Sequence, residues 1–176
     1  GKTTFLHLLA GIRTPTAGEV SVGGRNISAL SESARDEWRS RTIGYVFQNY
    51  YLFPALTVLD NTILPLTFAG CPARERTARA RQILDRLELG HRSSFYPRQL
   101  SAGEKQRAII ARAVVNHPQL ILADEPSANL DARRRSLLME LLQDVAGRHS
   151  STLVVATHDA ALAALFPDRM AIENFK

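Results

Sequence analysis

The chain has 176 residues, a length that fits one globular domain with a sizeable core. Apolar residues make up 45% of it and charged residues 22%, a composition that excludes collagen-like and disordered proteins. The formal net charge of +5 could indicate a nucleic-acid or anionic-membrane partner. However, the basic residues are scattered among acidic ones and only 7% of residues are aromatic, so we expect an ordinary solvated surface and no nucleic-acid partner.

The sequence contains no pattern for a membrane span, a leader or a zinc site. Its longest uninterrupted apolar run, residues 160–166, is far shorter than the roughly 18–20 residues that cross a bilayer. We find no signal-peptide pattern at the start of the chain and neither CxxC nor HExxH. The single cysteine, Cys71, cannot form an intramolecular disulfide, so we expect a reducing, cytoplasmic setting.

Periodicity and chain breakers predict alternating helices and strands in the first fifty residues. The expected elements are a helix over 2–10, a strand over 19–22, a reversal at Gly23-Gly24, a helix over 33–39 and a strand over 42–47. Ser33, with Asp36 three residues later, is typical of a helix N-cap. Gln48 follows the carboxyl end of the last of these strands.

The middle of the chain is predicted to be helical. Residues 54–88 indicate two helices around Pro65 and Gly70-Cys71-Pro72, and a further helix over 102–116 ends before Pro118. We therefore expect a helical subdomain at about 54–115 within a single domain that covers residues 1–176.

The last third indicates two buried strands, over 120–123 and 153–156, on either side of a helix. Asp131 is expected to cap that helix. Its predicted core-facing stripe is Leu137, Leu138, Leu141, Leu142 and Val145. Alternating strands and helices imply an α/β domain with a parallel sheet, whose chemistry lies at the carboxyl ends of its strands. Gln48, Asp124 and His158 all follow such ends.

Two motifs point to nucleotide chemistry. Gly1-Lys2-Thr3-Thr4 is the tail of the pattern G-x-x-x-x-G-K-[ST], in which backbone amides surround phosphates, the lysine contacts phosphate oxygens and the hydroxyl reaches Mg²⁺. Alone it also fits a surface loop. Asp124-Glu125 follows a buried strand, which lets one carboxylate bind Mg²⁺ and its neighbour act on an attacking water, although such a pair can also be a solvated strand end.

The stretch Leu100-Ser101-Ala102-Gly103-Glu104 resembles the LSGGQ signature of the nucleotide-binding subunits of ABC transporters. The whole chain follows that family's motif order. The matching segments are GKTT, YVFQ ending at Gln48, LSAGEKQR, LILADE, Asn129-Leu130-Asp131 and LVVATH ending at His158. YVFQ, Leu56-Thr57, Leu64-Pro65-Leu66 and Glu104 look most like the branch that serves lipoprotein release and macrolide export.

The resemblance implies a P-loop NTPase core that binds and hydrolyses ATP with Mg²⁺ and powers transmembrane export or lipoprotein release. Glu125 would polarise the attacking water, His158 would contact the γ-phosphate, and Gln48 would sense metal and water. The residues implied in nucleotide binding are Gly1, Lys2, Thr3, Thr4, Ser101, Gly103, Glu104 and Asp131, and those implied in metal binding are Thr3, Gln48 and Asp124.

The resemblance also implies partners and a location. Ser101 and Gly103 would bind the nucleotide of a second subunit, with Asp131 at the same interface, so the active unit would be a head-to-tail dimer. Transmembrane permease domains would be the other partners, with Tyr51 to Phe53 lining either the core or their docking groove. The subunit would be peripheral on the cytoplasmic face of the cell membrane.

Two departures from the family pattern leave alternatives open. The pattern's first half, with its strand, is absent before Gly1, so we expect a core that lacks the P-loop strand and a fragment of a longer product. Ala102 stands where the family has glycine, and we expect it to be tolerated. The alternatives are a non-hydrolysing regulatory module, or a DNA-maintenance ATPase, which would need a longer insertion than residues 49–99 provide.

Overall fold

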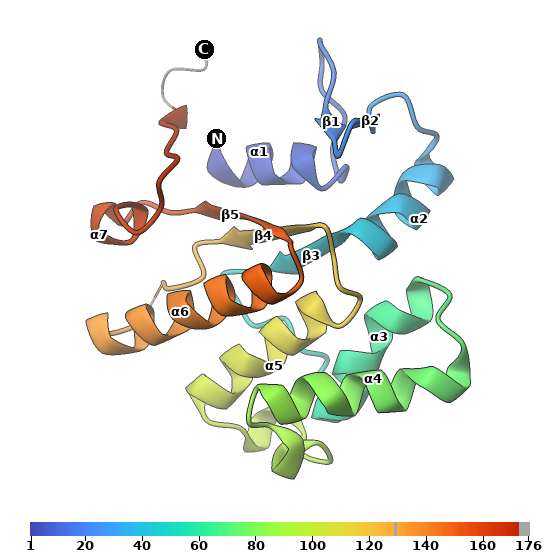
Figure 1. Cartoon of the computed structure of the whole chain (residues 1–176), viewed down its shortest axis with the longest axis vertical. Helices are drawn as coiled ribbons and strands as arrows, with labels where there is room; N and C mark the ends of the chain where they lie inside the picture. Colours follow the sequence, from blue (N-terminus) through green and yellow to red (C-terminus); the bar gives the residue numbers. More distant parts are fainter. Residues whose placement is uncertain (129, 173–176) are drawn as a thin grey trace.

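Three parallel strands form the main sheet of the computed structural model, which describes residues 1–128 and 130–172 (Figure 1). The strands are β3 (Ile43–Val46), β4 (Leu120–Asp124) and β5 (Thr152–Ala156), and β4 lies in the middle. The register pairs Val46 with Ala123 and Asp124 with Ala156, so all three strands end at one edge. The predicted parallel sheet is confirmed, and each bound of these three strands differs from its prediction by at most one residue, whereas the strand predicted over 19–22 is shorter, at Ser21–Val22.

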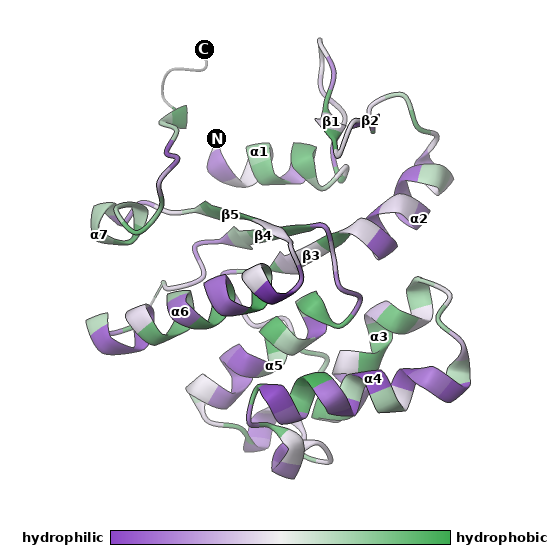
Figure 2. Ribbon diagram, in the orientation of Figure 1, coloured by the Kyte–Doolittle hydropathy of each residue, from purple (hydrophilic) through white to green (hydrophobic). Residues whose placement is uncertain are grey.

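The central strand is buried on both faces because helices cover the sheet on each side (Figure 1). On one side α1 (Lys2–Leu9) places Leu6 against Leu120 and Leu122 in a small core. On the other side α5 (Ala102–Val114) and α6 (Ala132–Arg148) pack over Ile121 and Ala123 in a larger core. Figure 2 shows β4 and β5 as a hydrophobic layer between these helices, which explains the unbroken apolar run of β4.

A second helical layer lies beyond α5. It consists of α3 (Val58–Phe68) and α4 (Ala73–Arg86), and two short 3-10 helices, Gly90–Arg92 and Pro97–Gln99, lead from it to α5. The two predicted helices are present, but Pro65 lies inside α3, and the chain turns at Gly70, where φ is +75°. None of the helices in the described part of the chain has both the length and the apolar character that crossing a bilayer requires.

Three glycines, at two places in the chain, shape the backbone locally. Gly23 and Gly24, with φ of +57° and +77°, join β1 (Ser21–Val22) to the antiparallel β2 (Arg25–Asn26), as predicted. Gly44 lies where α5 crosses β3, and a Cβ there would clash with the Ala113 carbonyl oxygen. The absence of a side chain at Gly44 therefore allows this helix to approach the sheet closely.

Two helix predictions need correction. Helix α2 (Glu32–Thr42) is capped by Ser31, whose hydroxyl accepts from the Ala34 amide, so the predicted cap at Ser33 is wrong. Ser31 has the extended backbone of an N-cap residue. In α6, Leu137 is 56% exposed, while Met139 and Ala146 are buried together with the predicted Leu138, Leu142 and Val145. Leu137 therefore lies just outside the stripe that contacts the core.

A capping box starts helix α5. The Ser101 hydroxyl accepts from the Glu104 amide, and a Glu104 carboxylate oxygen accepts from the Ser101 amide at 2.8 Å. The other Glu104 oxygen pairs with Arg92 at 2.8 Å. The hydrogen bonds from the Ser101 amide and hydroxyl, followed by the effect of Arg92, lower the pKa of Glu104 to about 2. The carboxylate therefore remains ionised at the helix N-terminus, where negative charge is stabilising.

We expect Glu104→Ala to lower the free energy of unfolding at neutral pH by about 1–2 kcal/mol, because it leaves the Ser101 amide without its acceptor. The folded-state pKa lies below the ordinary one. The stabilisation should therefore be complete above the ordinary pKa and should be lost as the pH falls toward about 2. Urea unfolding of the parent and of Glu104→Ala at several pH values measures this pH dependence. Glu104→Gln keeps the capping box but loses the charge, so its free energy of unfolding should lie between those of the parent and Glu104→Ala. If Glu104→Ala destabilised the protein as much near pH 3 as at neutral pH, the prediction would be wrong.

Candidate active site

Glu125 directly follows β4 and joins the ends of two strands. Its φ of +45° lies in the left-handed region, which is unusual for a residue other than glycine. The Glu125 amide donates to the Ala156 carbonyl oxygen at 2.8 Å, which continues the β4–β5 pairing by one residue. This backbone bend directs the Glu125 side chain to the carboxyl edge of the sheet.

The Glu125 carboxylate is the point where three distant segments meet. Its Oε1 atom lies 3.4 Å from Lys2 Nζ and 2.9 Å from His158 Nδ1, and its Oε2 atom accepts from the His158 amide at 3.3 Å. Burial raises the pKa of Glu125, but the hydrogen bonds from the His158 side chain and amide, together with Lys2, outweigh it and leave the pKa below its ordinary value. The structure thus places three predicted site residues together around one ionised carboxylate.

Asp124 lies one residue earlier, at the buried end of β4. The neighbouring strand places Tyr45 close enough that burial first, and the charge of Asp124 second, raise the pKa of Tyr45 to about 12. The ring of Tyr45 stacks on Phe47 with centroids 4.2 Å apart. Tyr45 is not among the predicted site residues, although Tyr45 and Phe47 are two residues apart in the strand, a spacing that predicts both rings on one face.

The other predicted residues at this edge make fewer contacts. Gly1, Thr3 and Thr4 lie exposed at the start of α1, and Gln48 is exposed just after β3. Within the described residues, no side-chain hydrogen bond joins Thr3 or Gln48 to Glu125. The first turn of α1 has no side-chain cap at Gly1, unlike the capped starts of the longer helices α5 and α6.

The signature residues lie apart from Lys2. Ser101 and Gly103 are exposed at the start of α5, which Figure 1 places well away from the start of α1. Ala102 is helical with a negative φ, so its methyl group causes no backbone strain. Asp131 caps α6 as predicted, accepting from the Arg134 amide at 2.9 Å, and Asn129 of the same motif lies outside the described residues.

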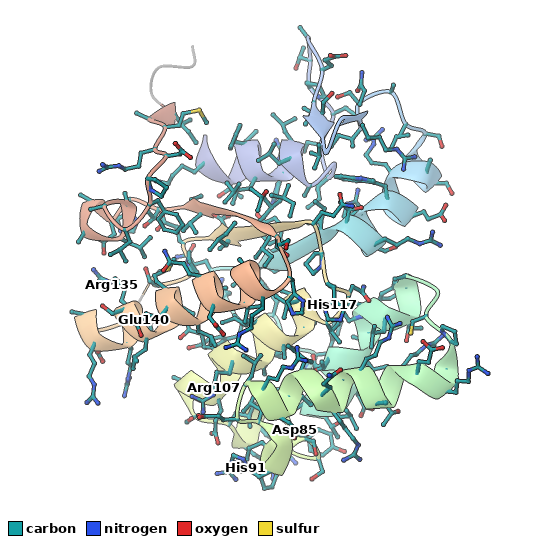
Figure 3. The ribbon with its side chains drawn as sticks, in the orientation of Figure 1. Asp85, His91, Arg107, His117, Arg135 and Glu140 are labelled. Atoms are coloured by element: carbon teal, nitrogen blue, oxygen red, sulfur yellow. The ribbon has the colours of Figure 1, made fainter. Side chains whose placement is uncertain are left out.

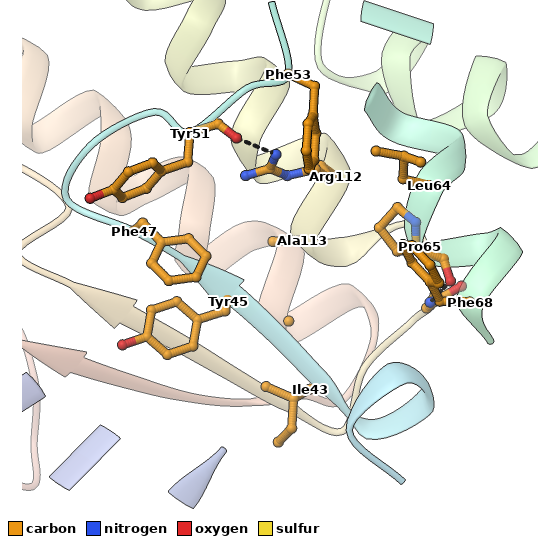
Figure 4. Close-up of a pocket in the computed structure, with 12 residues that line it drawn as sticks. Ile43, Tyr45, Phe47, Tyr51, Phe53, Leu64, Pro65, Phe68, Arg112 and Ala113 are labelled. Carbon is orange, nitrogen blue, oxygen red and sulfur yellow. Dashed lines mark hydrogen bonds between the residues drawn. The ribbon is translucent and has the colours of Figure 1, made fainter. Parts of the chain in front are cut away.

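An open groove of about 490 Å³ lies between β3, α3 and α5 (Figure 4). Its lining includes the exposed aromatic residues Tyr51, Phe53 and Phe68. The buried Asn61 holds the loop that carries two of them: its Oδ1 accepts from the Phe53 amide at 2.8 Å, and its Nδ2 donates to the Phe53 carbonyl oxygen at 3.1 Å. Arg112 donates to the Tyr51 carbonyl oxygen at 2.6 Å. The groove wall is therefore fixed by polar contacts, while its aromatic side chains stay exposed.

Two histidines that are far apart in the sequence form a pair. The Nδ1 atoms of His117 and His149 lie 2.8 Å apart. Burial lowers the pKa of both, and nearby cations such as Arg86 add to the effect. The pair precedes β4 and β5, at the end of the sheet opposite Glu125, so it does not belong to the site described above.

Comparison with known proteins identifies the family. The sequence profile described as "ABC transporter" matches residues 1–128. The "Lipoprotein-releasing system ATP-binding protein LolD" of Xylella fastidiosa (strain 9a5c) is 44% identical over 163 residues, which are 93% of this chain and 68% of that protein. The protein of the same name from Bacteroides fragilis (strain YCH46) is 42% identical over 93% of this chain and 76% of its own length. These relatives fall in the lipoprotein-release branch that the sequence indicates.

Solved structures agree with this assignment. The dimeric structure of MJ0796, a bacterial ABC transporter cassette, matches with a TM-score of 0.80 and 38% identity over 93% of this chain and 72% of its own length. A post-hydrolysis state of the same cassette bound to ADP and Pi matches equally well. The fold is thus that of the P-loop ATPase cassettes. The chain belongs to the ABC transporter family, in which it is an ATP-binding subunit, an ATPase coupled to transport.

Proposed function

We propose that this subunit binds and hydrolyses Mg²⁺-ATP at the Glu125 edge of the sheet and thereby drives lipoprotein release from a membrane. One observation carries the proposal: the Glu125 carboxylate is contacted by both Lys2 and His158. A carboxylate, a cation and an imidazole at the carboxyl edge of a parallel sheet are suited to phosphate chemistry.

The start of α1 fits the phosphates of a nucleotide. Its first-turn amides have no side-chain cap, so they remain available to an anion, and the helix dipole favours negative charge there. Lys2 supplies a full positive charge at the same point, while Gly1, Thr3 and Thr4 are exposed to solvent beside it. We assign these four residues to phosphate binding.

The oxygen-bearing side chains of Thr3, Gln48 and Asp124 fit a magnesium ion. Hydroxyl, amide and carboxylate oxygens are hard ligands of the kind that Mg²⁺ prefers, and Mg²⁺ is usually held by one or two carboxylates plus the substrate's phosphates. Asp124 is held at the end of the buried β4, while Thr3, at the start of α1, and Gln48, just after β3, are exposed to solvent. When bound, Mg²⁺ neutralises phosphate charge.

Hydrolysis is assigned to Glu125, with His158, which contacts it, and Gln48, which follows the carboxyl end of β3. An ionised Glu125 can accept a proton from an attacking water, because its pKa lies below the ordinary value. His158 is well exposed, so its ring can contact a terminal phosphate as well as Glu125. Gln48 connects this edge to the groove through the loop that follows β3.

A second subunit completes the site in this proposal. Ser101 and Gly103 are exposed and lie away from Lys2 in the same chain, and a Cβ built at Gly103 meets nothing within 4 Å. We assign these two residues, together with Glu104 and Asp131, to the contact with the nucleotide of a partner copy. The dimeric form of the MJ0796 cassette supports this arrangement.

The aromatic groove of Figure 4 is our proposed docking site for the permease partner. Phe53 and Phe68 expose large apolar surfaces on a wall that Asn61 and Arg112 hold in place. Exposed apolar patches of this kind mark interaction surfaces. Docking there places the subunit peripherally on the cytoplasmic face of the membrane, with residues 54–115 as the helical subdomain that contacts the permease.

We expect Glu125→Gln to lower the rate of ATP hydrolysis by about 100-fold or more, because the amide cannot accept the proton. Nucleotide binding should persist, since Lys2 and the α1 amides are unchanged. Steady-state ATPase assays and nucleotide titration of the full-length natural protein measure both. Glu140→Gln, on the exposed face of α6 (Figure 3), is the matched control and should be neutral. Undiminished hydrolysis in Glu125→Gln would remove Glu125 from this role.

We expect Phe53→Glu to weaken association with the permease by at least about tenfold, equivalent to ~1.4 kcal/mol, because it introduces a charge into the apolar contact. Nucleotide affinity should stay unchanged. Co-purification of the transporter complex measures the association. Leu137→Glu is the control, since Leu137 is as exposed as Phe53, at 56% against 54%, but lies on α6 outside the groove. Equal losses in the two variants would contradict the assignment of the groove.

A further inference from the structure

Arg135 joins the two loops that leave β4 and β5. It lies near the start of α6, four residues after the cap Asp131. One guanidinium nitrogen donates to the Asp159 carboxylate and the other to the Leu130 carbonyl oxygen at 3.4 Å. Leu130 directly precedes Asp131, and Asp159 directly follows His158. A single side chain therefore connects the loop of the proposed dimer contact with the loop of the proposed γ-phosphate contact.

Asp159 is fixed on both sides. Its Oδ2 atom accepts from Arg135, while its Oδ1 atom accepts from the amides of Ala161 and Leu162 at 2.8 and 3.2 Å and so caps α7 (Ala160–Ala163). These amides, that of Leu162 first, together with Arg135 keep the pKa of Asp159 below its ordinary value despite desolvation, so the pair stays charged at neutral pH. The residue before this anchor is His158, which contacts Glu125 through its ring and its amide.

This ion pair differs from the others on α6. The pairs Arg134–Asp131 and Arg148–Asp144 lie within the helix, and both arginine side chains are 67% exposed, so such pairs contribute little. The Arg135 and Asp159 side chains are only 31% and 21% exposed, and they link segments 24 residues apart. Their contact therefore determines how two loops sit relative to each other, which a pair within one helix does not.

We propose that Arg135 is a positioning residue: by holding Asp159 and the Leu130 carbonyl together, it keeps His158 against Glu125 and ties that contact to the loop of Asp131. The inference rests on the proposed hydrolysis at Glu125. It assigns Arg135 no contact with nucleotide. Figure 3 places Arg135 at the start of α6, on the side of the molecule where α7 lies.

The test separates the helix cap from the ion pair. Asp159→Asn keeps an oxygen that can cap α7, because Asn caps helices as well as Asp does, but it loses the charged acceptor for Arg135. Arg135→Gln removes the other partner. In the full-length natural protein we expect each variant to lower kcat for ATP about tenfold and to leave KM within about twofold. The double variant should be no worse than either single one, and Arg135→Lys should restore part of the rate.

Arg148→Gln is the matched control, since it removes an ion pair from the same helix far from either loop, and its kcat should be unchanged. A second readout does not depend on turnover: the NMR signals of the His158 ring should shift in Asp159→Asn and Arg135→Gln. Parental kcat in both variants, fully additive losses in the double variant, or unchanged His158 signals would each overturn the inference. Shifted His158 signals in a protein that never hydrolyses ATP would instead refute the proposed function and leave the positioning role standing.

Discussion

The parallel pairing of β4 with β5 is the constraint on which the site depends. Asp124 pairs with Ala156, and the Glu125 amide continues the ladder to the Ala156 carbonyl oxygen. Because of this register, His158, 33 residues after Glu125, lies within hydrogen-bond distance of its carboxylate. A slip of one residue would direct the side chains of β4 to the opposite faces of the sheet. Leu122 on one face and Ile121 on the other are fully buried, so packing opposes such a slip.

The sequence predicts the parts of this arrangement that depend on local signals. The apolar run before Asp124 predicts a buried strand, and Asp131 predicts the N-cap of the helix that follows. Contacts between distant segments have no such signal, which is why Arg135–Asp159 and His117–His149 were not anticipated. Where two local signals compete, as at Ser31 and Ser33, the backbone conformation decides, and residue order alone does not reveal it.

Strand β3 lies between the edge that carries Asp124 and the aromatic groove. β3 pairs with β4, the strand that ends at Asp124. The chain that follows β3 carries Gln48 and then Phe53, which lines the groove. Gly44 lets α5 pack tightly on the strand, so β3 cannot shift without moving both its neighbour strand and this helix. The groove and the end of β4 are therefore joined through one short strand and its packed neighbours.

The contacts around Glu125 also limit its chemistry. Lys2 and His158 keep the carboxylate ionised, and for the same reason they make it a weaker base, since a low pKa means a low affinity for a proton. Burial acts in the opposite direction and is the largest single influence on this carboxyl group. In the proposed reaction, a bound anion near Lys2 would compete with Glu125 for the ammonium group. Loss of that contact would act in the same direction as burial, toward a higher pKa of Glu125.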